Sequence, residues 1–206
     1  MKTEIYLVRH SKTQKINIVN SSDTLQLRNE KSILSVDGEK LAEEVSKYHD
    51  FDNVDVVYSS SYTRAVATAK YIANRNNLDI NIDQRFNERK HGVDSYNELP
   101  KDFEIKQFID ENFKMINGEN RKEVTIRMYE ALLDILNNYS SKKVVIVSHS
   151  TAIAFLLSKW CNINYSDSYT FKDKIFFDGV WNYCQTFKLE FEGKELKNIE
   201  NITLFK

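Results

Sequence analysis

The sequence predicts an α/β fold, a three-layer α/β/α sandwich with a mainly parallel central sheet and an antiparallel edge strand. Residues 5–8 and 143–148 are apolar with no polar alternation, which is typical of strands buried on both faces of a sheet. Segments with helical spacing of apolar residues separate such strands, which indicates βαβ units and a parallel sheet. Residues 185–192 instead alternate between apolar and charged side chains, as expected for a strand with one wet face at or near a sheet edge.

The other elements follow in order along the chain. Residues 14–32 are polar and rich in Asn and Ser, which predicts a long loop beside the end of the first strand. Ser35 is a suitable N-cap for a helix over 36–49. Further helices are expected at 62–74, 95–116 (interrupted near Pro100), 119–138 and 151–161, and further strands at 52–59, 78–82 and, after a turn at Gly193, up to residue 205.

Length and composition narrow the class of protein. The 206 residues suit one domain, 1–206, and 41% hydrophobic with 29% charged residues is a globular composition. A net charge of −1 without long basic runs argues against a nucleic-acid binder. Two isolated cysteines predict a reducing compartment, and the longest apolar runs are too short to span a membrane. Since the first strand begins almost at the N-terminus, leaving no room for a signal peptide, we expect a cytoplasmic protein.

Three of the predicted strands are followed by cationic or titratable residues that are common in active sites. Arg9 and His10 follow the first strand, a serine-rich turn with Arg64 shortly after it follows the second, and His149 follows the strand at 143–148. Each alone could be a solvated strand end. Because parallel strands share one carboxyl edge, where ligands collect in α/β sheets, the sequence predicts that these four side chains converge.

Such a cluster suits phosphoryl chemistry. Guanidinium groups match phosphate oxygens in a bidentate manner, and helix N-termini near Tyr62 and Thr151 add backbone donors. An imidazole among cations stays partly neutral and nucleophilic, because nearby positive charge lowers its pKa. His10 could then form a phosphohistidine, and Glu88 is the best-placed carboxyl group to protonate the departing oxygen.

The motifs resemble those of the histidine phosphatase superfamily, which includes the phosphoglycerate mutases. The blocks L-V-R-H, S-S-S-Y-T-R-A-V-A-T-A, F-N-E-R-K-H-G and V-S-H-S occur in the order of that family, and the resemblance covers most of the chain. It implies that His10 is phosphorylated, that Arg9, Arg64 and His149 hold the phosphoryl group, and that Glu88 acts as general acid and then base. It also implies a small phosphorylated metabolite as substrate, with no metal and no cofactor.

Further candidates for substrate binding lie close to these motifs, and three of them depart from the family pattern. Ser11 and Ser150 stand where the family usually has glycine, and Asn17 lies one position beyond the usual asparagine. Arg89 and His91 follow Glu88 in a polar turn, where contact with an anionic substrate and a plain, solvated turn position are equal alternatives. Arg127, on the helix at 119–138, is expected to form an ion pair rather than to bind substrate.

Three activities are compatible with this set of residues. Hydrolysis is favoured over mutase chemistry, because residues 101–120 lack the adjacent arginine pair that family mutases carry there. A non-catalytic phosphate-binding module is disfavoured, because every catalytic residue is present. No motif specifies the substrate or an oligomeric state.

Overall fold

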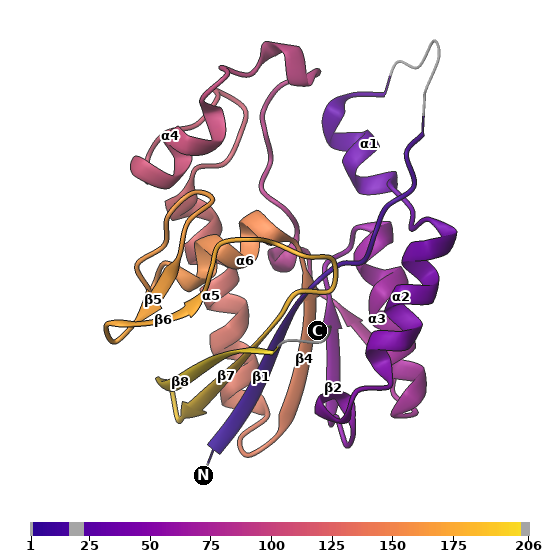
Figure 1. The fold of residues 1–206 in the computed structure, drawn as a ribbon. Helices are drawn as coiled ribbons and strands as arrows, with labels where there is room; N and C mark the ends of the chain where they lie inside the picture. The colour runs from indigo at the N-terminus through magenta and orange to yellow at the C-terminus, as the bar shows by residue number, and fades with distance from the viewer. Residues whose placement is uncertain (1, 17–22, 203–206) are drawn as a thin grey trace.

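The computed structural model describes residues 2–16 and 23–202, and a six-stranded sheet forms its centre (Figure 1). The strand order is β3-β2-β4-β1-β7-β8. Four neighbouring strands are parallel, and β7 and β8 form an antiparallel hairpin that closes one edge. The bounds are β1 Lys2–Arg9, β2 Val56–Ser59, β3 Ile80–Ile82, β4 Lys143–Ser148, β7 Thr186–Glu192 and β8 Glu195–Ile202. The predicted fold class is confirmed, with two antiparallel strands at the edge.

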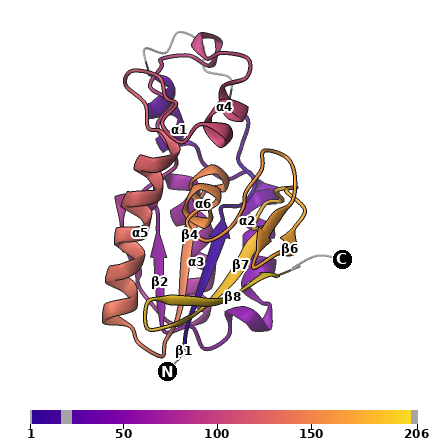
Figure 2. The same ribbon diagram turned by 90° about the vertical axis from the view of Figure 1, so that its left-hand side faces the viewer.

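Helices cover both faces of the sheet, as Figure 2 shows from the side. Side chains of successive strand residues point to opposite faces, so Ile5 and Leu7 join the core beneath α5 and α6, whereas Tyr6 and Val8 join the core beneath α2 and α3. The helices are α1 Leu25–Lys31, α2 Val36–Ser46, α3 Thr63–Arg75, α4 Phe103–Ile109, α5 Arg121–Asn138 and α6 Ser150–Leu157. No helix in the described ranges is long and apolar enough to cross a membrane.

Two predicted segments differ from the structure. The expected loop at 14–32 contains α1, which begins at Leu25, and the side chain of Thr24 caps its N-terminus by accepting the N–H of Leu27. Only α4 forms within the helix expected at 95–116, because turns flank it. A 3₁₀ turn at 96–98 and Pro100 precede α4, and after α4 the side chain of Asp110 accepts the N–H of Asn112 in the next turn. Both α1 and α4 stand above the carboxyl ends of β1 and β4 (Figure 1), so the two differences concern the segments nearest the predicted site.

A second, two-stranded sheet was not predicted. It pairs β5, Tyr169–Phe171, with β6, Lys174–Phe177, in antiparallel fashion. Its aromatic rings pack on one another and on the main sheet, with Phe177 5.0 Å from Phe187 between ring centroids. This packing fixes the segment that leads to Trp181, whose ring lies 5.4 Å from that of Phe187.

Candidate functional site

The predicted site begins where β1 and β4 end side by side. The two strands are parallel and pair Arg9 with Ser148, and the backbone N–H of His10 donates to the carbonyl of Ser148 at 2.9 Å. This register brings the next residues together, so that the ring centroids of His10 and His149 lie 5.2 Å apart. The predicted convergence of the strand ends is therefore present in the fold.

The imidazole ring of His10 is buried, and it makes one hydrogen bond among the described residues. Its Nδ1 lies 2.7 Å from the carbonyl oxygen of Ser11, and because a carbonyl only accepts, Nδ1 carries the proton. Nε2 is then the unprotonated nitrogen with a lone pair. Burial, reinforced by the positive charge of Arg64, lowers the pKa of His10 well below its ordinary value. The ring is thus neutral at pH 7, with Nε2 available as a nucleophile.

His149 and Arg64 form a second part of the site. The Nη2 of Arg64 donates to His149 Nδ1 at 3.0 Å, so Nε2 carries the proton and donates to Ser60 Oγ at 2.8 Å. Complete burial, followed by the charge of Arg64, lowers the pKa of His149 well below its ordinary value. Arg64 lies in the first turn of α3, and its Nη1 donates to the carbonyl of Asn29 in α1. Asn29 therefore lies over the site.

Arg9 completes the cationic part of the site. Its Nη1 donates to the carbonyl of Trp181 at 2.8 Å, its guanidinium lies 5.0 Å from the centroid of the Tyr183 ring, and its buried Nε has no hydrogen-bond partner among the described residues. Within the described ranges, neither Arg9 nor Arg64 has a carboxylate at ion-pair distance. Burial lowers the pKa of both arginines. Two desolvated cations with no carboxylate at ion-pair distance among the described residues favour the binding of an anion here.

Glu88 approaches the same site from the turn after β3. Its Oε1 accepts the backbone N–H of Arg89 at 2.9 Å and that of Ala152 at 3.0 Å, which fixes the carboxylate at the N-terminus of α6. Its negative charge acts on both Arg9 and Arg64. The site thus contains a neutral imidazole with an unprotonated Nε2, two cations and one carboxyl group.

Comparison with known proteins identifies the family. The model of the histidine phosphatase superfamily (branch 1) matches residues 5–194. This chain belongs to the histidine phosphatase superfamily. The predictions of family and enzyme class are confirmed.

Individual relatives include both phosphatases and mutases by name. The chain is 30% identical over 157 residues to the uncharacterized phosphatase PhoE of Bacillus subtilis (strain 168). The aligned region covers 76% of this chain and 77% of that protein. It is 28% identical over 163 residues to the probable phosphoglycerate mutase GpmB of Enterobacter sp. (strain 638), which covers 75% and 73%.

Solved structures share the fold. The mycobacterial glucosyl-3-phosphoglycerate phosphatase Rv2419c superposes with a TM-score of 0.72 at 16% identity, over 98% of this chain and 100% of that one. Bacillus stearothermophilus YhfR superposes with a TM-score of 0.68 at 20% identity, over 95% and 94%. At these identities, the likeness concerns the fold.

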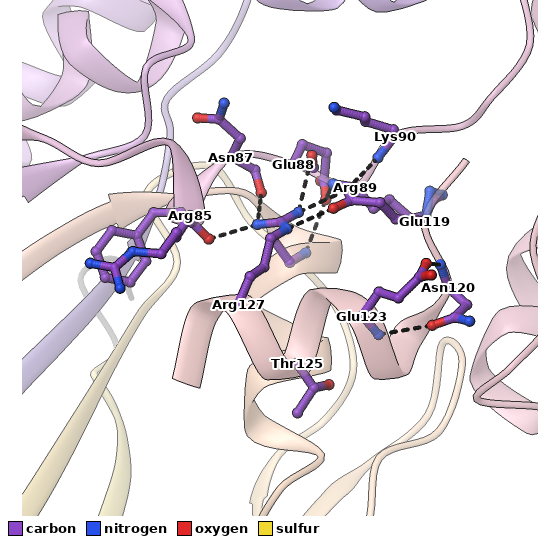
Figure 3. A network of polar contacts seen from close by, with 12 residues as sticks. Arg85, Asn87, Glu88, Arg89, Lys90, Glu119, Asn120, Glu123, Thr125 and Arg127 are labelled. Atoms are coloured by element: carbon purple, nitrogen blue, oxygen red, sulfur yellow. Dashed lines mark hydrogen bonds and ion pairs between the residues drawn. The ribbon is translucent and has the colours of Figure 1, made fainter. Parts of the chain in front are cut away.

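An ion-paired network contacts the turn that carries Glu88, as Figure 3 shows. Arg127 forms a bidentate ion pair with Glu119, at 2.8 and 3.0 Å, and also donates to the carbonyls of Arg85 and Asn87. A weaker hydrogen bond of 3.4 Å reaches the carbonyl of Glu88. The predicted ion-pair role of Arg127 is confirmed, and the network holds the turn that carries the carboxyl group of the site.

Two residues of the turn after Glu88 are buried, so the solvated-turn alternative is wrong for Arg89 and His91. Arg89 is only 3% exposed: it donates to Gln107 at 2.6 Å and forms an ion pair with Glu104 of α4. His91 packs between the rings of Tyr96 and Phe103, and burial, followed by the charge of Arg89, lowers its pKa to about 4. The guanidinium of Arg89 is engaged by Gln107 and Glu104 of the same chain. The substrate contacts predicted for Arg89 and His91 stay predictions.

The remaining predicted substrate residues have different environments. Ser11 is fully buried, and its hydroxyl donates to the carbonyl of Gly38 in α2 at 2.7 Å, so it fastens that helix to the site loop. Ser150 begins α6 and is partly exposed beside His149. Asn17 lies outside the described residues.

Sequence reasoning missed several contacts of the site. Ser60 was visible in the serine-rich block, but only the fold shows that its hydroxyl bonds His149. The backbone carbonyls of Asn29 and Trp181 accept hydrogen bonds from Arg64 and Arg9. Because every residue has such a carbonyl, the residue type does not reveal these contacts. Among the described residues, no cluster of three or more His, Cys, Asp or Glu side chains suits a metal ion.

Proposed function

We propose that this protein is a metal-independent phosphomonoester hydrolase that acts through a phosphohistidine on His10. One observation carries the proposal: a buried, neutral imidazole with a free Nε2 lies beside two arginines that lack carboxylate partners. In this proposal the phosphate dianion binds to Arg9 and Arg64, beside the ring of His149, whose Nδ1 accepts a hydrogen bond from Arg64 and whose Nε2–H donates to Ser60. The arginines supply the positive charge that a metal ion supplies in other phosphatases.

The first step transfers the phosphoryl group to the enzyme. The Nε2 lone pair of His10 forms a bond to phosphorus while the ester P–O bond breaks. The departing oxygen takes the proton of the Glu88 carboxyl group and leaves as an alcohol. The Nδ1–H bond to the Ser11 carbonyl, at 2.7 Å, keeps the imidazole oriented and stabilises the positive charge that develops on the ring.

The second step releases phosphate. Glu88, now a carboxylate, takes a proton from a water molecule as that water attacks phosphorus. The P–N bond breaks, its electron pair returns to Nε2, and inorganic phosphate departs. The carboxyl group is protonated again, which completes the cycle. The proposal includes a small phosphorylated metabolite as substrate, and a cytoplasmic location in keeping with the two unpaired, buried cysteines.

A mutase would instead return the phosphoryl group to another hydroxyl of a sugar acid. The relatives named as probable phosphoglycerate mutases raise this alternative. The paired arginines that family mutases use are missing, and Arg121, the arginine nearest that position, donates to the carbonyl of Phe108 at 2.9 Å. Hydrolysis is therefore the better-supported activity.

The deciding experiment measures p-nitrophenyl phosphate hydrolysis in excess EDTA by the wild type, His10→Ala and His49→Ala. We expect turnover by the wild type and the exposed-histidine control, and a loss of at least about 10³-fold in His10→Ala, because the nucleophile is removed. Acid quenching should trap an acid-labile phosphoenzyme only when His10 is present. Wild-type turnover by His10→Ala would overturn the mechanism, and phosphoryl exchange between sugar acids without phosphate release would assign a mutase.

A further inference from the structure

A hollow of about 550 Å³ lies between α4, α6 and the segment around the second sheet. We call it the α4–α6 hollow. The residues that line it are Glu104, Phe108, Ser150, Thr151, Ala154, Tyr165, Ser166, Tyr169, Gly179, Val180 and Trp181. Its size is in the range of a pocket for a small organic group.

Two of its lining residues adjoin the proposed catalytic centre directly, and a third is linked to it through Arg89. Ser150 follows His149 in the chain, and the carbonyl of Trp181 accepts the hydrogen bond of Arg9. Glu104 forms the ion pair with Arg89, the residue after Glu88. The α4–α6 hollow therefore lies next to Arg9 and His149, and it is placed to receive the group that the phosphate carries.

The described lining combines four aromatic side chains with three hydroxyls and one carboxylate, and it contains no cationic side chain. The rings of Phe108 and Tyr165 meet at 5.5 Å in an edge-to-face arrangement, and Trp181 adds a third aromatic wall. None of the described residues that line the hollow is a lysine, arginine or histidine, and the carboxylate of Glu104 is neutralised by Arg89. An aromatic or aliphatic group would gain from burial here, whereas a carboxylate would lose water and find no cation.

We infer that the substrate carries an uncharged, apolar or aromatic group in the α4–α6 hollow, so that phosphates of neutral alcohols are preferred over phosphates of carboxylic acids. This inference rests on the proposed function for the position of the phosphoryl group. It narrows the substrate class, because sugar-acid phosphates and phosphoamino acids are then poor ligands.

Binding of two non-hydrolysable ligands tests the inference independently of turnover. Benzylphosphonate and (4-carboxybenzyl)phosphonate differ only in one carboxylate, and isothermal titration of the wild-type protein gives the dissociation constant of each. We expect benzylphosphonate to bind at least tenfold more tightly. Equal binding, or tighter binding of the carboxylate, would overturn the inference.

Charge insertion locates the effect in the hollow. Tyr165 is 44% exposed and lines the hollow, whereas Ile116 is 91% exposed and does not line it. Tyr165→Lys should lower the preference for benzylphosphonate at least threefold, because it supplies the missing cation. Ile116→Lys adds the same charge elsewhere, and Tyr165→Phe keeps the ring, so both should retain the wild-type ratio. An equal change in Tyr165→Lys and Ile116→Lys would refute the placement of the organic group.

The two proposals fail in different ways. Hydrolysis of p-nitrophenyl phosphate together with equal binding of both phosphonates would leave the hydrolase standing and remove the inference. Selective phosphonate binding without hydrolysis or a phosphoenzyme would remove the proposed function and leave the recognition of neutral groups.

Discussion

Two pairs of arginines lie near Glu88, and they differ in their partners. Among the described residues, Arg9 and Arg64 meet carbonyls, a ring nitrogen and two aromatic faces, with no carboxylate at ion-pair distance. Arg89 and Arg127 meet the carboxylates of Glu104 and Glu119. All four belong to the same end of the molecule, yet only the first pair retains unneutralised charge.

This difference predicts that the first pair binds an anion, whereas the second pair stabilises the fold. A buried guanidinium without a carboxylate is destabilising until an anion arrives, so its desolvation favours binding of phosphate. A guanidinium paired with a carboxylate holds two segments together and has little charge left for a ligand. We therefore expect loss of activity from changes in the first pair and loss of stability from changes in the second.

The largest effect is expected at Glu88, whose negative charge acts on Arg9 and Arg64. Glu88→Gln keeps the size of the side chain but cannot give a proton, so hydrolysis of alkyl phosphates should fall about 10²- to 10⁴-fold. Hydrolysis of p-nitrophenyl phosphate should fall much less, because nitrophenolate leaves without protonation. Steady-state kinetics with both substrates check this, and equal losses would show that Glu88 is not the acid.

Arg64→Met tests the unneutralised pair. We expect kcat/KM to fall about 10²- to 10³-fold, as when one preorganised donor to a transition state is lost. Urea unfolding should show unchanged or higher stability, because the substitution removes a buried charge that has no counter-ion. Unfolding at markedly lower urea than the wild type would mean that Arg64 is mainly structural.

Arg127→Met tests the paired arginines. The free energy of unfolding should fall by about 3 kcal/mol, because the part-buried carboxylate of Glu119 and the carbonyls of Arg85 and Asn87 lose their donor. The control is Arg75→Met, since Arg75 forms a solvent-exposed ion pair with Asp52 whose loss should cost less than about 1 kcal/mol. Similar losses in the two variants would remove the distinction between the pairs.

The smallest effect concerns the pH dependence of stability. The folded-state pKa of His91 is lowered from 6.5 to about 4, so between these values the unfolded state binds a proton that the folded state does not. Stability is then lost as the pH falls below 6.5, by about 1.4 kcal/mol per such histidine at pH 5.5. His10 and His149 shift in the same direction and add to the loss.

His91→Phe should remove that share of the pH dependence, because phenylalanine fits between Tyr96 and Phe103 and does not titrate. Thermal unfolding at pH 7.5 and 5.5 measures the difference. His49→Phe serves as the control, since the His49 side chain is 88% exposed and should leave the difference as it is in the wild type. An unchanged difference in His91→Phe would contradict the assignment.

Local patterns predicted the elements that are regular and amphipathic. Apolar runs predicted β1 and β4, and the spacing of Val124, Met128 and Leu132 predicted α5, whose capping box at Asn120 and Glu123 fixes its start. The helix predicted over 95–116 shrank to α4, because polar turns that bond locally replaced a continuous pattern. The loop that contains α1 was too polar to show an apolar stripe.

The sequence by itself determined the family, the strand ends and the residues gathered there, because motifs and hydrophobic periodicity are local. Only the tertiary structure decided which arginines are neutralised, which nitrogen of His10 is free, and that a cation-free hollow borders the centre. Those properties depend on partners far along the chain, such as Arg64 with His149, 85 residues away, and Arg9 with Trp181, 172 residues away. Charge compensation depends on which groups meet in space, and the order of residues does not specify that until the sheet has brought them together.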